Sequence, residues 1–169
     1  MTLLGPLIAA PSFASPPCFP DYVQAYFDNA DLNYSLPRGK FEPYLVKYYA
    51  EHNIAAPWAI TGDFNGDGIE DWAGLARSGE NKLDLVTVVS SGGDYGHHLL
   101  TPLGSDDDGI YFGVELEPPG KLEGFPLDDE VPEPSISIEN TSIHLFYFEK
   151  SSVLYYFRDN EFHEFWTSD

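Results

Sequence analysis

Apolar residues recur along this chain with two different periodicities, and the first of them is that of an α-helix. Helical spacing of aromatic and apolar residues predicts a short helix over 21–30, with Asp21 as its N-cap. A second apolar stripe predicts a helix within 37–52; its members are Phe41, Tyr44, Leu45, Tyr48 and Tyr49. Because proline is tolerated only in the first turn of a helix, Pro43 limits the regular part to the residues that follow it.

From Trp58 onward the pattern changes to short alternating or apolar runs bounded by turn residues, which is typical of strands. The expected strand segments are a hairpin over 58–77, then 82–90, 97–103, 110–116, 135–138, 142–148, 152–157 and 161–166. Short turns predict that 135–138 pairs with 142–148, and that 152–157 pairs with 161–166 around an Asp-Asn turn. The proline-rich stretch 117–134 is expected to be a long irregular connection.

These elements predict an α+β fold. We expect an antiparallel β-meander or one curled sheet, with the N-terminal helix at 37–52 packed on one face. The chain has 169 residues, which suits a single domain over 21–169. The uncharged apolar run at 1–14 ends in small residues and is interpreted as a degenerate or truncated signal peptide, since it is too short to span a bilayer.

The most informative motif lies inside the first hairpin, where residues 62–75 read GDFNGDGIEDWAGL. Oxygen-bearing side chains occupy alternate positions at Asp63, Asn65 and Asp67, and Asp71 closes the run. Ca²⁺ takes roughly 6–8 oxygen ligands at about 2.3–2.6 Å, and short side chains at every second position can converge on it. The sequence therefore predicts one Ca²⁺ bound by these four side chains and by the Ile69 carbonyl.

Two further residues distinguish this loop from an EF-hand. Gly68 can make the sharp turn that such a loop needs, as in calcium loops generally. Gly74 stands where an EF-hand keeps its bidentate glutamate, and the flanking segments read as strands rather than helices. The motif resembles the calcium loop of FG-GAP (VCBS-type) repeats. In that family the loop sits in a hairpin, commonly one per blade of a β-propeller; a single copy here implies the loop and its cation but not the whole propeller.

Charge restricts the classes of partner. Eight Lys and Arg residues face 28 Asp and Glu residues, which gives a net charge of −20. Such a surface repels nucleic acid and anionic membranes, and it favours cations and a basic protein partner. A second acidic turn at 105–109, with Asp106 and Asp108, has only half of a cation loop and is expected to be a turn. The lone Cys18 permits no disulfide within the chain and is given no role.

Signatures of catalysis do not stand out in the chain. It has no nucleophile elbow, phosphate loop or dinucleotide fingerprint, and His97 and His98 should point to opposite faces of a strand. We therefore expect a secreted or periplasmic, calcium-binding, non-catalytic module that binds another protein, such as an inhibitor or immunity protein, through its acidic face or the 117–134 segment, where Phe125 is a candidate anchor. The alternative is a calcium-supported hydrolase or carbohydrate-active protein.

Overall fold

A computed structural model describes residues 18–52, 58–79, 81–105, 107, 109–125, 135–148 and 150–168. The expected signal segment at 1–14 lies outside these residues. The helices are α1 (Asp21–Asn29) and α2 (Pro43–Glu51). The strands are β1 (Tyr34–Ser35), β2 (Ala59–Gly62), β3 (Asp71–Ser78), β4 (Lys82–Ser91), β5 (Asp94–Gly104), β6 (Phe112–Glu117), β7 (Gly120–Glu123), β8 (Ser135–Ile138), β9 (Ser142–Tyr147), β10 (Ser152–Arg158) and β11 (Glu161–Ser168).

The first sheet is built on the central pair β3 and β4. Its order is β1-β3-β4-β5, and β2 also pairs with β3. Both β1 and β2 use the same edge of β3: Tyr34 pairs with Ser78 at one end, and Ala59 pairs with Gly74 nearer the other. All of these pairs are antiparallel, so the predicted hairpin at 58–77 is confirmed as β2 and β3.

The second sheet has the order β11-β10-β9-β6 and is also antiparallel. The predicted hairpin of 152–157 with 161–166 is confirmed, and Asp159 and Asn160 form its turn, each with positive φ. The predicted hairpin of 135–138 with 142–148 is wrong. β8 pairs with β7, which lies inside the stretch expected to be irregular, while β9 pairs with β6 and β10.

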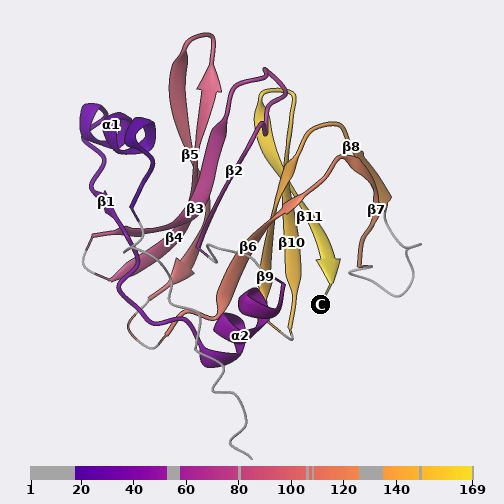
Figure 1. Ribbon diagram of the computed structural model, residues 1–169. Coiled ribbons are helices and arrows are strands. Elements are labelled where there is room, and N and C mark those ends of the chain that lie inside the picture. The colour runs from indigo at the N-terminus through magenta and orange to yellow at the C-terminus, as the bar shows by residue number, and fades with distance from the viewer. Residues whose placement is uncertain are drawn as a thin grey trace, which may run out of the picture.

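One core lies between the two larger sheets. Leu75, Leu83 and Leu85 of the first sheet share a buried cluster with Val114, Leu145 and Val153 of the second. The predicted curled antiparallel arrangement is confirmed in outline, but the strands divide into separate sheets, because β6 pairs with β9 rather than with β5. Figure 1 shows the two curved sheets next to each other, with the small β7–β8 pair beyond the second sheet.

The opposite face of β3 and β4 is also covered. Trp72, Val86 and Val88 point to this face, where they form a buried cluster with Val23 and Phe27 of α1. Successive strand residues point to opposite faces, so alternate residues of β3 and β4 enter two different cores. Burial on both faces is why every residue of β4 except its first and last is buried.

The helices in the described residues are short, and the fold is mostly antiparallel β. The predicted α+β class therefore overstates the helix content. Each helix has nine residues. The N-cap of α1 is Pro20, and Asp21 lies in the first turn, which corrects the predicted cap. Pro43 is the first residue of α2, as predicted, and Tyr49 of that helix is fully buried with its ring 6.1 Å from that of Phe146 on β9.

Helix length also bears on membranes. Across the described part of the chain, no helix combines the length and apolar character that a membrane crossing requires.

Candidate metal site

The predicted calcium motif forms the loop that joins β2 to β3. Gly66 and Gly68 adopt positive φ values of 80° and 82°, so the turn expected at Gly68 is confirmed. Phe64 inserts its ring into the core between the sheets and is fully buried. The loop is thus fixed by one deep apolar side chain, while Asp67 and the residues around the two glycines are exposed.

The Asp63 carboxylate closes the first half of this loop. Its Oδ1 accepts hydrogen bonds from the backbone N–H groups of Gly66 at 2.7 Å and Asp67 at 3.1 Å. Its Oδ2 accepts one from the Gly68 N–H at 2.9 Å. Three N–H donors therefore converge on one carboxylate, which helps to hold the loop in its curled form.

Asn65 and Asp67 link the loop to the end of β4. The Asn65 amide donates to the Ser90 carbonyl at 2.6 Å, and its Oδ1 accepts from the Asp67 N–H at 3.0 Å. Asp67 Oδ1 accepts from the Ile69 N–H at 2.9 Å, and Oδ2 lies 2.7 Å from the Ser90 hydroxyl. The Ser90 hydroxyl, and after it the Ile69 N–H, hold the pKa of Asp67 below its ordinary value.

Asp71 is the deepest of the predicted ligands, because its residue is fully buried at the start of β3. Its Oδ2 accepts from the Phe64 N–H at 2.8 Å, and its Oδ1 accepts from the Ser90 N–H at 2.8 Å. Burial nevertheless raises the pKa of this carboxyl, with the hydrogen bonds from Ser90 and Phe64 acting in the opposite direction. Asp67 adds a smaller repulsion that also raises it.

The Ser90 hydroxyl brings two of these carboxylates together. It lies 2.7 Å from Asp67 Oδ2 and 3.0 Å from Asp71 Oδ1. A serine hydroxyl has one hydrogen, so it cannot donate a full hydrogen bond to both. The two carboxylates thus compete for one hydroxyl hydrogen, and when both are ionised they repel each other, which a cation would relieve.

The donor atoms of the loop are of the type that a hard cation prefers. Their present positions, however, do not form a cage around one point. Three carboxylates and one amide supply oxygen donors, the ligand type that Ca²⁺ prefers. Within the described residues, Asp63 Oδ2, Asp67 Oδ1 and Asp71 Oδ2 each accept one hydrogen bond, so each keeps a lone pair. Among those same residues, however, no group of three or more His, Cys, Asp or Glu side chains is arranged to hold a metal.

The predicted ligands are therefore in one loop but not in one cage. Asp67 and Asp71 converge at Ser90, whereas Asp63 turns its oxygens toward the N–H groups of the loop. The Ile69 side chain is 43% exposed and its N–H is bonded to Asp67, and the role of its carbonyl as a ligand stays a prediction. If a cation binds, it has to draw the Asp63 carboxylate toward the other two.

Other predicted features fall in different places. Asp106 and Asp108 of the second acidic turn lie outside the described residues; between them, Asp107 accepts a hydrogen bond from the Asn81 amide at 2.6 Å. His97 and His98 contact different partners, as expected for neighbours on a strand. His97 lies against Tyr26 of α1, and His98 lies against aromatic rings of β10 and β11.

Ser90 is the residue of this candidate site that the sequence did not reveal. It lies 19 residues after Asp71 and reaches it only because β3 and β4 pair in a register that sets Trp72 opposite Val88. No spacing within the motif points to a serine so far away. The only available signal was its position as a polar residue ending the apolar run of β4.

The chain was compared with models of known protein families, with curated proteins and with solved structures, and none of them matches it.

Proposed function

We propose that this protein is an exported, calcium-stabilised, non-catalytic binding module that engages a basic protein, in the manner of an inhibitor or immunity protein. The observation that carries the calcium part is the convergence of Asp67 and Asp71 on the single hydroxyl of Ser90. Because Asp71 is fully buried, its negative charge has no access to bulk water. A divalent cation in the loop would compensate that charge and tie β2, β3 and the end of β4 together.

The binding part of the proposal is supported by the charge of the chain. A net charge of −20 gives a strong negative potential, which accelerates association with a basic partner and opposes binding of nucleic acid. Phe125, the candidate anchor, is 39% exposed, and its N–H donates to the Trp166 carbonyl of β11 at 2.9 Å. Trp166 is itself 38% exposed, so this backbone hydrogen bond joins two partly exposed aromatic residues.

The calcium proposal predicts a specific loss of binding. Asp67→Ala should abolish calcium binding measured by calorimetry, because it removes a central charged ligand from a small site. Calcium should also raise the melting temperature of the native protein by several degrees relative to chelator, since a hundredfold excess over Kd adds about 2.7 kcal/mol to the free energy of unfolding.

Magnesium should substitute poorly for calcium, because it requires a tighter octahedron and retains its waters.

The matched control for this experiment is Glu70→Ala. Glu70 belongs to the same loop and is exposed, so its removal changes the net charge equally but deletes none of the proposed ligands. Calcium affinity should be nearly unchanged in this variant. Equal affinities of Asp67→Ala and the native protein, or an identical melting temperature with and without chelator, would rule out the calcium role.

The partner proposal predicts an electrostatic effect on the association rate. Reversal of Asp128, Asp129 and Glu130 to lysine should slow association with a basic partner captured from the native secretome, and should flatten the dependence of that rate on salt. These three residues lie outside the described part of the chain, in the segment that joins β7 to β8. The measurement is stopped-flow or surface-based kinetics at several ionic strengths.

The control must change the net charge by the same amount elsewhere. A triple reversal of Glu51, Asp94 and Glu161, which are all exposed, meets this requirement. If both triple variants slow association equally, the acidic surface acts only through its total charge. If neither variant changes the rate, no basic partner is recognised through charge.

A further inference from the structure

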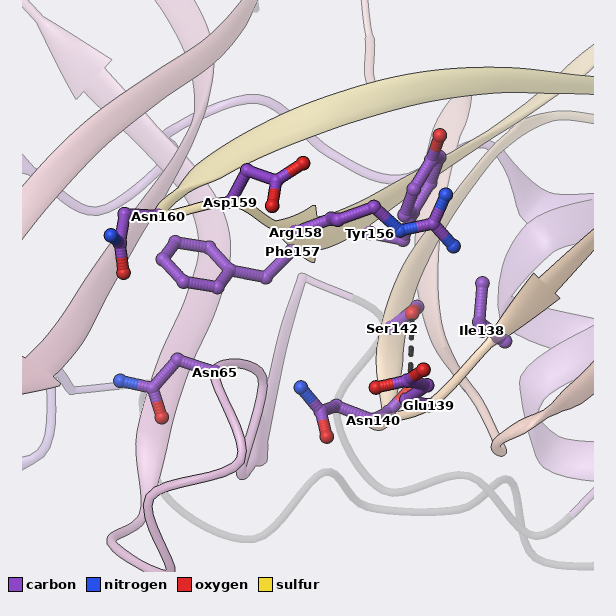
Figure 2. A pocket seen from close by; sticks show the side chains of 10 residues that line it. All are labelled: Asn65, Ile138, Glu139, Asn140, Ser142, Tyr156, Phe157, Arg158, Asp159 and Asn160. Carbon is purple, nitrogen blue, oxygen red and sulfur yellow. Dashed lines mark hydrogen bonds between the residues drawn. The ribbon is translucent and has the colours of Figure 1, made fainter.

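A polar cavity lies beside the loop just described, at the point where three turns meet. Its volume is about 440 Å³, within the roughly 300–1,000 Å³ typical of small-molecule pockets. One wall is Asn65 of the β2–β3 loop, a second is the 139–142 connection into β9, and the third is the end of β10 with its turn into β11. Figure 2 shows the side chains of these three segments around the cavity.

Several polar side chains in this cavity have hydrogen-bonding capacity that the protein itself does not use. Within the described residues, the side chains of Glu139, Asn140, Asp159 and Asn160 form no hydrogen bond or ion pair with another residue. Two amides and two carboxylates can together donate and accept many hydrogen bonds. A ligand with many hydroxyl groups would match them, because a hydroxyl both donates and accepts.

Aromatic and cationic groups complete the lining. Tyr156 and Phe157 are half-buried neighbours on β10, and Figure 2 shows their rings extending in different directions from the strand. The Arg158 guanidinium lies 5.1 Å from the centre of the Tyr156 ring, and it donates to the Ser137 carbonyl at 2.7 Å. The Tyr156 ring is therefore contacted by this guanidinium and also by the stacked ring of His163, whose centre lies 5.4 Å away, so the polar side chains provide the surface that is left for a ligand.

The backbone holds part of this lining in a fixed position. Asp159 and Asn160 have φ values of 54° and 65°, the left-handed pair that makes a tight two-residue hairpin turn. The two strands that this turn connects, β10 and β11, are paired through seven residue pairs, which holds the backbone of the turn in place. On the opposite wall, the Asn140 side chain approaches Gly66 so closely that a Cβ there would lie 2.7 Å from Asn140 Oδ1. A fixed backbone at this turn lowers the ordering cost of binding.

Charge and size narrow the class of ligand. The lining carries the carboxylates of Glu139 and Asp159 and the guanidinium of Arg158, a net charge of about −1 in a chain of net charge −20. That balance disfavours anions. The positive charge of Arg158 also opposes binding of a cationic group at the same place.

We propose that this cavity binds a neutral saccharide of one or two rings. The uncommitted side chains of Asn140, Asn160, Glu139 and Asp159 bond its hydroxyl or acetamido groups. The inference goes beyond calcium and protein binding. It does not depend on either, because most of the lining comes from residues 138–160.

The experiment is a titration of the full chain with two neutral disaccharides, cellobiose and N,N′-diacetylchitobiose, followed by amide NMR shifts. At least one should give saturable shifts with a Kd at or below about 1 mM, centred on 139–142 and 156–160. Asn160→Gly removes the amide but keeps a turn that glycine accepts, and Asn140→Ala removes the second amide. Each should weaken binding about five- to tenfold, as expected for the loss of one or two hydrogen bonds.

Gln24→Ala on α1 is the matched control, because it also deletes an exposed amide but lies outside the cavity, and it should leave the affinity unchanged. No saturable shift with either sugar, or equal affinities in all variants, would overturn the inference, as would saturable binding of trilysine in place of the sugars. Titrations in chelator and in calcium separate the proposals. Sugar binding without calcium binding upholds this inference alone, and calcium binding without sugar binding overturns it while leaving the calcium role intact.

Discussion

Asp71→Ala is expected to lower the free energy of unfolding by about 2–4 kcal/mol in the presence of chelator. The residue is fully buried, and its carboxylate accepts hydrogen bonds from the N–H groups of Phe64 and Ser90. Alanine would leave both donors without an acceptor at a site where little water can reach them. A buried donor left unpaired costs about 1–3 kcal/mol, so two of them account for the expected range.

Glu70→Ala is the matched control for this measurement, because Glu70 precedes Asp71 directly and is exposed. Its effect should stay within about 0.5 kcal/mol, as for most surface substitutions. Chelator removes any contribution of a cation, so the difference between the two variants reports the loss of the buried Asp71 carboxyl together with its hydrogen bonds. Urea unfolding followed by tryptophan fluorescence gives both values. A loss below 1 kcal/mol for Asp71→Ala would show that the two N–H groups find other acceptors.

The same carboxylate gives the protein a characteristic pH dependence. Burial raises the pKa of Asp71 above its ordinary value of 3.8, so the folded state holds this proton more tightly than the unfolded chain does. The part of the stability that comes from binding this proton is therefore fully present below pH 3.8 and is lost as the pH rises through the raised folded-state pKa. A bound cation would reverse this by favouring the ionised form. Calcium should thus stabilise the protein more at neutral than at acid pH.

Local patterns predicted the elements of this fold well where neighbours in the chain determine the outcome. Pro43 set the start of α2 because proline has no N–H to donate and suits a first turn. The Asp159–Asn160 turn set the β10–β11 hairpin because both residues tolerate positive φ. The glycines of the β2–β3 loop were recognisable for the same reason.

Pairing between distant strands could not be predicted in this way. Residues 135–138 and 142–148 are separated by a short turn, yet β8 leaves β9 and pairs with β7. Ile138 then joins Leu154 and Phe165 in a separate small core on the second sheet. The gain from covering these buried residues is a tertiary effect, and it is invisible in the alternation of a four-residue segment.

The candidate site also contains residues that local spacing predicts and residues that only the pairing of distant strands brings together. Asp63 and Gly68 could be placed from spacing alone, because their bonds close within a few residues. Ser90 could not, since it meets Asp71 only through the register of β3 and β4. The cavity beside the loop was equally hidden, because its walls come from three turns that are far apart in sequence.

Phe64→Ala is the second substitution with a large expected effect, a loss of about 3–5 kcal/mol in the free energy of unfolding. Phe64 is fully buried although it lies in a loop between two polar ligand candidates. Its ring belongs to the core between the two larger sheets, together with residues of β3, β4, β6 and β9. Alanine would leave a cavity at the junction of the sheets and release the loop from its one deep anchor.

Ile69→Ala provides the comparison within the same loop. The Ile69 side chain is 43% exposed, so its truncation should cost less than about 1 kcal/mol. Phe64→Leu should recover much of the stability, because it restores most of the apolar volume without a polar atom. Equal losses for Phe64→Ala and Ile69→Ala would mean that the ring does not fix the loop. Phe64→Ala can also weaken calcium and sugar binding while Phe64→Leu does not. In that case the buried apolar side chain at position 64 positions the loop for both ligands, since Asp63 and Asn65 flank it on either side.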